Sequence, residues 1–139
     1  MTTNPVRRPE SHGNCLLCGD RNRFGLGLRF YAVSDSEVEA VLNSKRHHQG
    51  YQGILHGGFV ASLMDSAMCN VLFHRGIEAV TGDISIRYLE EIPYDCEVVL
   101  RGLFLGGSAP LFKVEAVLMR EGRIVVRAKA RFVKRGYGK

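Results

Sequence analysis

The stretch that decides the fold is GILHGGFVASLMDSAMCNVLF, residues 53–73. Apolar side chains would cover most of the circumference of a helix here, which is typical of a helix buried in a protein core. The helix is expected to start near Gly57 and to end before Gly76. Its polar residues have i, i+3, i+4 and i+7 spacing and form one narrow stripe: Ser62, Asp65, Ser66 and Cys69. Burying a carboxylate is costly, so Asp65 is a candidate for chemistry.

Strand-like segments lie on both sides of the predicted helix. Two precede it, at 24–34 and 37–43, and the polar tripeptide SDS between them indicates a turn. Four more follow it, at 81–92, 96–107, 110–120 and 123–135. In the last segment apolar side chains alternate with Arg127, Lys129 and Arg131, and the two-residue turn EG before it predicts a hairpin.

This order of elements predicts an α+β fold. One helix cannot cover both faces of a sheet with so many strands, but a strongly curved antiparallel sheet can wrap around the helix. A curved antiparallel sheet around one long central helix is the hotdog fold. Residues 1–22 show no periodicity and are predicted to form an N-terminal arm, and residues 23–139 are predicted to form a single hotdog domain.

The composition fits one ordinary globular domain, with 139 residues of which 45% are hydrophobic and 24% charged. No apolar run approaches the length that spans a bilayer. The N-terminal stretch MTTNPVRRPESHGN lacks the apolar core of a secretory signal, so we expect a cytoplasmic protein that does not enter a membrane. The net charge of +5 suits an anionic partner, either a small molecule that bears a nucleotide or a nucleic acid.

The four cysteines, Cys15, Cys18, Cys69 and Cys96, follow no disulfide framework and are expected to be reduced thiols. His12 precedes the CxxC pair that Cys15 and Cys18 form. A structural zinc ion usually takes four ligands, and no second ligand pair lies at suitable spacing. The sequence alone therefore predicts no metal site.

Two motifs resemble a known family. The stretch HQGYQGILHGGFVASLMDSA (48–67), followed by TGDISIRYLEEIP (81–93), is similar to the PaaI-like branch of the hotdog-fold acyl-CoA thioesterases. The opening CLLCGDRNRFGLGLRF (15–30) resembles the lead-in of many members. The resemblance implies hydrolysis of an acyl-CoA thioester to a free acid and CoA, without a cofactor because CoA is part of the substrate. The family also contains dehydratases and proteins of no shown activity, so the alternative is a non-catalytic protein that binds or senses acyl thioesters.

The same resemblance assigns roles to individual residues. It makes Asp65 a nucleophile or general base, and it gives the backbone N–H of Gly58 or Gly57 the task of polarising the thioester carbonyl. Gln49 and His48 match the polar side chain that family members often carry before HGG to orient substrate or water. Unpaired N–H donors at the positive end of a helix dipole suit an oxyanion, and glycine lets a substrate approach the backbone closely.

Other polar residues near this motif have two interpretations each. His56 is either a hydrogen-bonding partner or general acid at the helix entry, or a structural cap of the preceding turn. Ser66, a candidate substrate-binding residue, either orients water or the Asp65 carboxylate, or packs. His47 and His48 lie in a polar loop and are expected to be solvated.

The spacing within the helix predicts a dimer. Asp65 lies seven residues after Gly58, which is about 10 Å along the axis at roughly 1.5 Å per residue. One thioester carbonyl cannot touch both groups. If both act on it, they come from different protomers whose central helices run antiparallel. We therefore expect a homodimer at least, with the choice between a dimer and a tetramer left open.

Arg127, Lys129 and Arg131 form a basic stripe on the last predicted strand. They are candidates for binding the phosphates of CoA. The alternative is a solvated strand face whose charges protect a sheet edge. Nucleic-acid binding is disfavoured, because no platform of aromatic side chains is interleaved with these charges.

Overall fold

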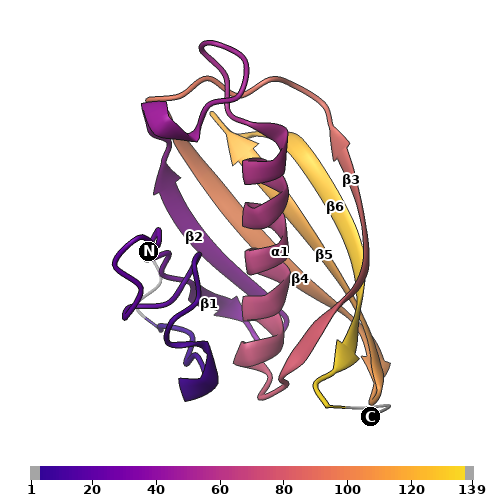
Figure 1. Cartoon of the computed structure of the whole chain (residues 1–139). Helices are drawn as coiled ribbons and strands as arrows, with labels where there is room; N and C mark the ends of the chain where they lie inside the picture. Colours follow the sequence, from indigo (N-terminus) through magenta and orange to yellow (C-terminus); the bar gives the residue numbers. More distant parts are fainter. Residues whose placement is uncertain (1–3, 137–139) are drawn as a thin grey trace.

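Helix α1 (Gly57–His74) packs on one side of a single antiparallel sheet in the computed structural model, which describes residues 4–136 (Figure 1). The sheet has six strands in the spatial order β1-β2-β4-β5-β6-β3. Their bounds are β1 Tyr31–Ser34, β2 Glu37–Asn43, β3 Ala79–Tyr88, β4 Glu97–Ser108, β5 Leu111–Arg120 and β6 Arg123–Lys134. Two 3-10 turns, η1 (Glu10–His12) and η2 (Arg46–His48), precede the helix. The predicted hotdog fold is confirmed.

The first strand is shorter than predicted. β1 begins at Tyr31 instead of residue 24, because the preceding backbone pairs with the N-terminal segment. The N–H of Leu28, for example, donates a hydrogen bond to the carbonyl oxygen of Leu17 over 2.9 Å. The N-terminal segment therefore packs against the rest of the fold, and Cys18 within it is only 1% exposed.

One face of α1 rests directly on the sheet. Leu63, Met64 and Met68 are fully buried there, and burial of such side chains stabilises the packing by roughly 1.5–3 kcal/mol each. The close approach of helix and sheet depends on Gly102 in β4. A Cβ at this position would lie 2.3 Å from the carbonyl oxygen of Ala67, so only glycine fits without a shift.

The two edges of the sheet differ. β1 is covered by the N-terminal segment, since the N–H of Val6 donates to the carbonyl oxygen of Phe30 and Pro5 pairs with Tyr31. Within residues 4–136, β3 has only β6 as a neighbour, and it is exposed along most of its length. An open edge strand offers unpaired backbone groups to another strand.

A bulge in β3 changes which side chains face the helix. Thr81 lies opposite Phe132, which is buried, whereas Asp83 lies opposite Arg131, which is exposed. Gly82 is therefore an extra residue that interrupts the alternation of the strand. As a result, Thr81 faces α1 and not the outer face of the sheet.

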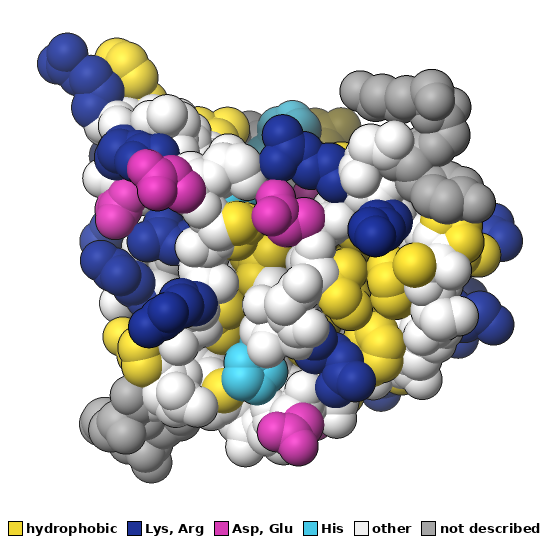
Figure 2. Space-filling view, turned by 90° about the horizontal axis from the view of Figure 1, so that it is seen from below, with side chains coloured by type: hydrophobic (Ala, Val, Ile, Leu, Met, Phe, Trp, Pro, Cys, Tyr) yellow, Lys and Arg dark blue, Asp and Glu magenta, His cyan; other side chains and the backbone are white. Residues whose placement is uncertain are grey.

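The surface carries basic and apolar side chains side by side. Figure 2 views the molecule from the end where α1 finishes, and apolar side chains are open there among Lys and Arg side chains. This matches the net charge of +5 and favours an anionic ligand. None of the helices within residues 4–136 has the length and apolar character that a membrane span requires.

Candidate active site

The centre of the candidate site is the pair formed by Asp65 and Thr81. Asp65 lies in the middle of α1 and Thr81 near the start of β3, and the Thr81 hydroxyl donates a hydrogen bond to Asp65 Oδ1. Asp65 is only partly buried in the single chain, because it lies on the side of the helix toward the open edge of the sheet. One carboxylate oxygen is thus held in place while the group remains accessible.

The helix start is capped by His56. Its backbone is extended, with φ −64° and ψ 134°, and its Nδ1 accepts a hydrogen bond of 2.8 Å from the N–H of Gly58. The ring therefore carries its proton on Nε2 when it is neutral. The N–H of Gly57, in contrast, has no acceptor among residues 4–136. Of the two glycines proposed from sequence, Gly57 has the N–H that is free to bind a ligand.

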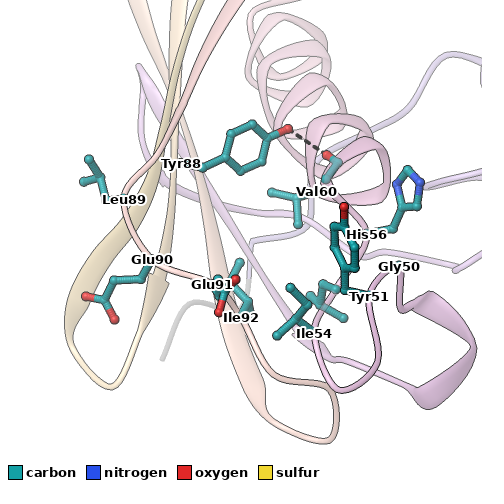
Figure 3. Close-up of a pocket in the computed structure, with 12 residues that line it drawn as sticks. Gly50, Tyr51, Ile54, His56, Val60, Tyr88, Leu89, Glu90, Glu91 and Ile92 are labelled. Carbon is teal, nitrogen blue, oxygen red and sulfur yellow. Dashed lines mark hydrogen bonds between the residues drawn. The ribbon is translucent and has the colours of Figure 1, made fainter.

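A cavity of about 830 Å³ opens at this end of α1 (Figure 3). Gly57, His56 and Val60 line it from the helix, and Tyr51 and Ile54 line it from the preceding loop. Figure 3 shows Tyr88 of β3 pointing toward the helix start, where its hydroxyl donates a hydrogen bond of 2.7 Å to the carbonyl oxygen of Gly57. Burial raises the pKa of Tyr88, which keeps this donor protonated.

The two polar residues proposed before HGG hold the loop. Gln49 Oε1 accepts a hydrogen bond of 2.9 Å from the N–H of Gly53. His48 is only 8% exposed, so the expectation that it is solvated is wrong. Its Nδ1 accepts from the N–H of Lys45 over 3.1 Å, and its ring stacks on Phe59 with 4.1 Å between ring centres. The turn η2 folds this histidine inward, and neither Gln49 nor His48 lines the cavity.

Ser66 takes no part in the hydrogen bond between Asp65 and Thr81. Its side chain is buried at 5% exposure, and its Oγ has no hydrogen-bond partner among residues 4–136. It makes no hydrogen bond with the neighbouring Asp65 in that part of the chain, so its proposed role in orienting substrate gains no support from the geometry.

The basic stripe divides into one paired and two unpaired residues. Arg131 forms an ion pair with Asp83. Arg127 and Lys129 line a groove of about 430 Å³ together with Arg87 of β3, which lies directly opposite Arg127. No carboxylate within residues 4–136 lies close enough to pair with these three cations. They are therefore available for an anion.

The structure separates the predicted catalytic groups along the helix. Gly57 and His56 line the cavity, whereas Asp65 does not. Eight residues separate Gly57 from Asp65, about 12 Å along the helix axis. The single chain therefore holds two half-sites, one at the helix start and one at its middle.

Sequence reasoning missed Thr81 and Tyr88 in these half-sites, and Arg87 in the groove beside Arg127 and Lys129. Simple alternation along β3 places Thr81 on the outer face with Asp83, and only the bulge at Gly82 reverses this. Arg87 could have been found by pairing the stripe on β6 with the strand beside it. The strand order that makes β3 this neighbour comes from the fold.

The antiparallel sheet around one long central helix makes the chain a hotdog protein, and its candidate site combines a carboxylate at mid-helix with a free N–H at the helix start. Residues 52–127 match the family model of the thioesterase superfamily. This match covers more than half of the chain, and the chain belongs to the thioesterase superfamily. A search of curated proteins gives no match.

Solved structures share the fold. One thioesterase superfamily protein has a TM-score of 0.81 at 21% identity over 87% of this chain and 60% of its own, so this chain spans less than two thirds of it. A hypothetical thioesterase from Streptococcus pneumoniae, solved with coenzyme A, has a TM-score of 0.73 at 22% identity. The match covers 78% of this chain and 89% of that protein. A variant of the phenylacetic acid degradation protein PaaI from Thermus thermophilus has a TM-score of 0.71 at 23% identity. The match covers 78% of this chain and 94% of that protein. The predicted membership of the hotdog thioesterases is thus confirmed, and PaaI shares the fold of this chain.

The Streptococcus pneumoniae protein has also been solved with alanine in place of an aspartate and, separately, of a threonine. These two positions are 16 residues apart. Asp65 and Thr81 have the same separation of 16 residues.

Proposed function

We propose that this protein hydrolyses an acyl-CoA thioester to a free acid and CoA, at a site completed by two protomers. The observation that carries the proposal is the Asp65 carboxylate, which Thr81 holds beside an open strand edge. Membership of the thioesterase superfamily supports the reaction class. The coenzyme A in the Streptococcus pneumoniae structure, and the equal spacing of an aspartate and a threonine there, support the substrate and the pair.

The chemistry needs an activated water and a stabilised oxyanion. The hydroxyl of Thr81 occupies one oxygen of Asp65, which leaves the other oxygen to accept a proton from water. The water oxygen then bonds to the thioester carbonyl carbon, and the N–H of Gly57 stabilises the negative oxygen that forms. The C–S bond breaks, and the proton taken up by Asp65 passes to the departing CoA sulfur.

His56 acts in this scheme as a positioning residue. Its Nδ1 holds the N–H of Gly58, so the first turn of α1 is fixed while the N–H of Gly57 stays free. The hydroxyl of Tyr88 restrains the same turn from the side of β3.

Two protomers are needed because Gly57 and Asp65 are too far apart for one carbonyl. The open edge of β3, which carries the exposed apolar residues Val80 and Ile84, is the surface on which a second copy would pack. If the two copies of α1 run antiparallel there, Asp65 of each chain meets the helix start of the other.

The CoA nucleotide would bind on the outer face of the sheet. Arg127, Lys129 and Arg87 line one groove without carboxylate partners in the described part of the chain. The guanidinium group of an arginine can donate two parallel hydrogen bonds to a phosphate of CoA.

The test is thiol release from a panel of short, long and aromatic acyl-CoA substrates. We expect turnover of at least one substrate and a loss of roughly 10²–10⁴-fold in kcat/KM in Asp65→Asn. Asp83→Asn is the matched control, since Asp83 is an exposed carboxylate paired with Arg131 on the outer face. Tight binding of acyl-CoA without turnover would favour the non-catalytic alternative, and equal rates in Asp65→Asn and the parent would remove Asp65 from the mechanism.

A further inference from the structure

Three potential metal ligands come together in the N-terminal segment. The ligand atoms of His12, Cys15 and Cys18 all lie within 4.8 Å of one another. Cys18 is buried, and His12 and Cys15 are partly buried. Imidazole and thiolate ligands at this mutual distance can share one ion.

The turn that carries the two cysteines is tightly wound. The N–H of Leu17 donates a hydrogen bond of 3.4 Å to Cys15 Sγ. The N–H of Gly19 donates to the carbonyl oxygen of Cys15 over 3.0 Å. A Cβ on Gly19 would lie 2.4 Å from the backbone N of Cys15, so this turn closes only with glycine after Cys18.

The cluster lies against α1, beside the C-terminal half of the helix (Figure 1). The ring of His12 meets Phe73 edge-on with 4.8 Å between ring centres. Burial raises the pKa of Cys18 to about 11, with a hydrogen bond from Asn70 acting in the opposite direction.

A third thiol, Cys69, lies in α1. Cys69 follows Asp65 by one helical turn, and burial together with the charges of Asp65, Cys18 and Cys15 raises its pKa. Three protein ligands suffice for a tetrahedral zinc ion when water or a further side chain takes the fourth position. The ligand set that the fold brings together is His12, Cys15 and Cys18, and the fourth position is open to water.

We propose that His12, Cys15 and Cys18 bind one zinc ion, which fastens the N-terminal segment to α1 beside Phe73. Soft thiolates combined with imidazole select zinc over hard cations such as magnesium or calcium. Binding releases the thiol protons, and the dication offsets the charge of the thiolates. The site makes the N-terminal segment part of the folded unit and does not depend on the proposed hydrolase activity.

The direct test is the metal content of tag-free protein, purified with a reductant and without chelators. We expect one zinc ion per chain. After zinc is removed and cobalt is added, we expect the absorption of thiolate-to-cobalt charge transfer. Background metal content together with the absence of this absorption would overturn the proposal, as would an intact Cys15–Cys18 disulfide in the reduced preparation.

Variants locate the site. Cys15→Ser and His12→Ala should lose zinc. Cys96→Ser should keep it, because the Cys96 thiol lies elsewhere in the fold, where it donates a hydrogen bond to the carbonyl oxygen of Pro93. If the variants fail to fold, alkylation of the unaltered protein still decides: chelation should make Cys15 more reactive and leave Cys96 unchanged. Equal zinc loss in Cys15→Ser and Cys96→Ser, or equal reactivity of Cys15 with and without chelator, would contradict the assignment.

Discussion

The hydroxyl of Thr81 in β3 donates a hydrogen bond to Oδ1 of Asp65 in α1, and so ties the middle of the central helix to the edge of the sheet. Both residues lie where the sheet is open to a second copy. A carboxylate oriented by a neighbouring hydroxyl, and still partly exposed, is suited to take a proton from water.

Replacing Thr81 by valine tests whether this hydroxyl orients the carboxylate. Thr81→Val keeps the shape of the side chain and removes the donor, so we expect kcat to fall roughly 10–100-fold with little change in KM. Thr81→Ser keeps a hydroxyl and should retain most of the activity. Steady-state thiol release measures both. An equal loss in the two variants would mean that packing, not the hydrogen bond, matters at this position.

The sequence predicted the helix and the strand pattern because both depend on side-chain periodicity. The run of apolar residues at 57–74 can only be a core helix, and Asp65 is conspicuous within it. The role of Thr81 was not predictable, because the bulge at Gly82 is a property of strand pairing that reverses the apparent face.

The contacts at the helix start could not be predicted from the sequence either. The HGG motif predicts a free N–H, but which glycine keeps it free depends on His56, whose ring takes the N–H of Gly58. The burial of His48 likewise depends on the turn η2 and on Phe59. Neither contact leaves a periodic signal in the sequence.

Replacing Gly57 by proline tests the proposed oxyanion donor. Proline is well tolerated at the first position of a helix and has no N–H, so Gly57→Pro deletes the donor while the helix is kept. We expect kcat to fall roughly 10²–10³-fold. Gly57→Ala is the control, because its Cβ would meet only Tyr88 at 3.8 Å and the N–H remains. Circular dichroism confirms folding, and full activity in folded Gly57→Pro would exclude this N–H as the donor.

Acid should destabilise the protein partly through His48. Burial, then the charges of His47 and Lys45, lower its pKa in the folded state. The unfolded chain takes up a proton near pH 6.5, while the folded protein resists it, so stability is present above about pH 6.5 and is lost as pH falls through the folded pKa. We expect the free energy of unfolding, measured by urea titration, to decline on acidification.

The dependence of the unfolding free energy on pH, compared between variants, assigns this effect to one residue. His48→Phe cannot titrate, keeps a ring that can stack on Phe59, and should give a flatter dependence. His47→Gln removes one of the charges that lower the pKa of His48, so it should flatten the dependence less than His48→Phe does. An identical slope in His48→Phe and the parent would refute the assignment.

Removing Arg127 tests the phosphate groove. Arg127→Ala should raise KM for acyl-CoA about 3–10-fold at constant kcat, because it removes a charge-assisted contact to the nucleotide. The same acyl group on pantetheine, which lacks the nucleotide phosphates, should show no such effect. Arg123→Ala is the control, since Arg123 already pairs with Glu90 at 2.9 Å. A KM that rises equally for both substrates would place Arg127 outside phosphate recognition.

Mixed dimers decide whether two chains share the site. Asp65→Asn and Gly57→Pro are each expected to be inactive alone, since each lacks one half-site. When they pair, one of the two shared sites carries both changes and the other carries neither. Random pairing makes half of the dimers mixed, so co-expression should restore roughly a quarter of the parent activity. If both groups act within one chain, every site stays defective, and the mixture would remain as inactive as its parts.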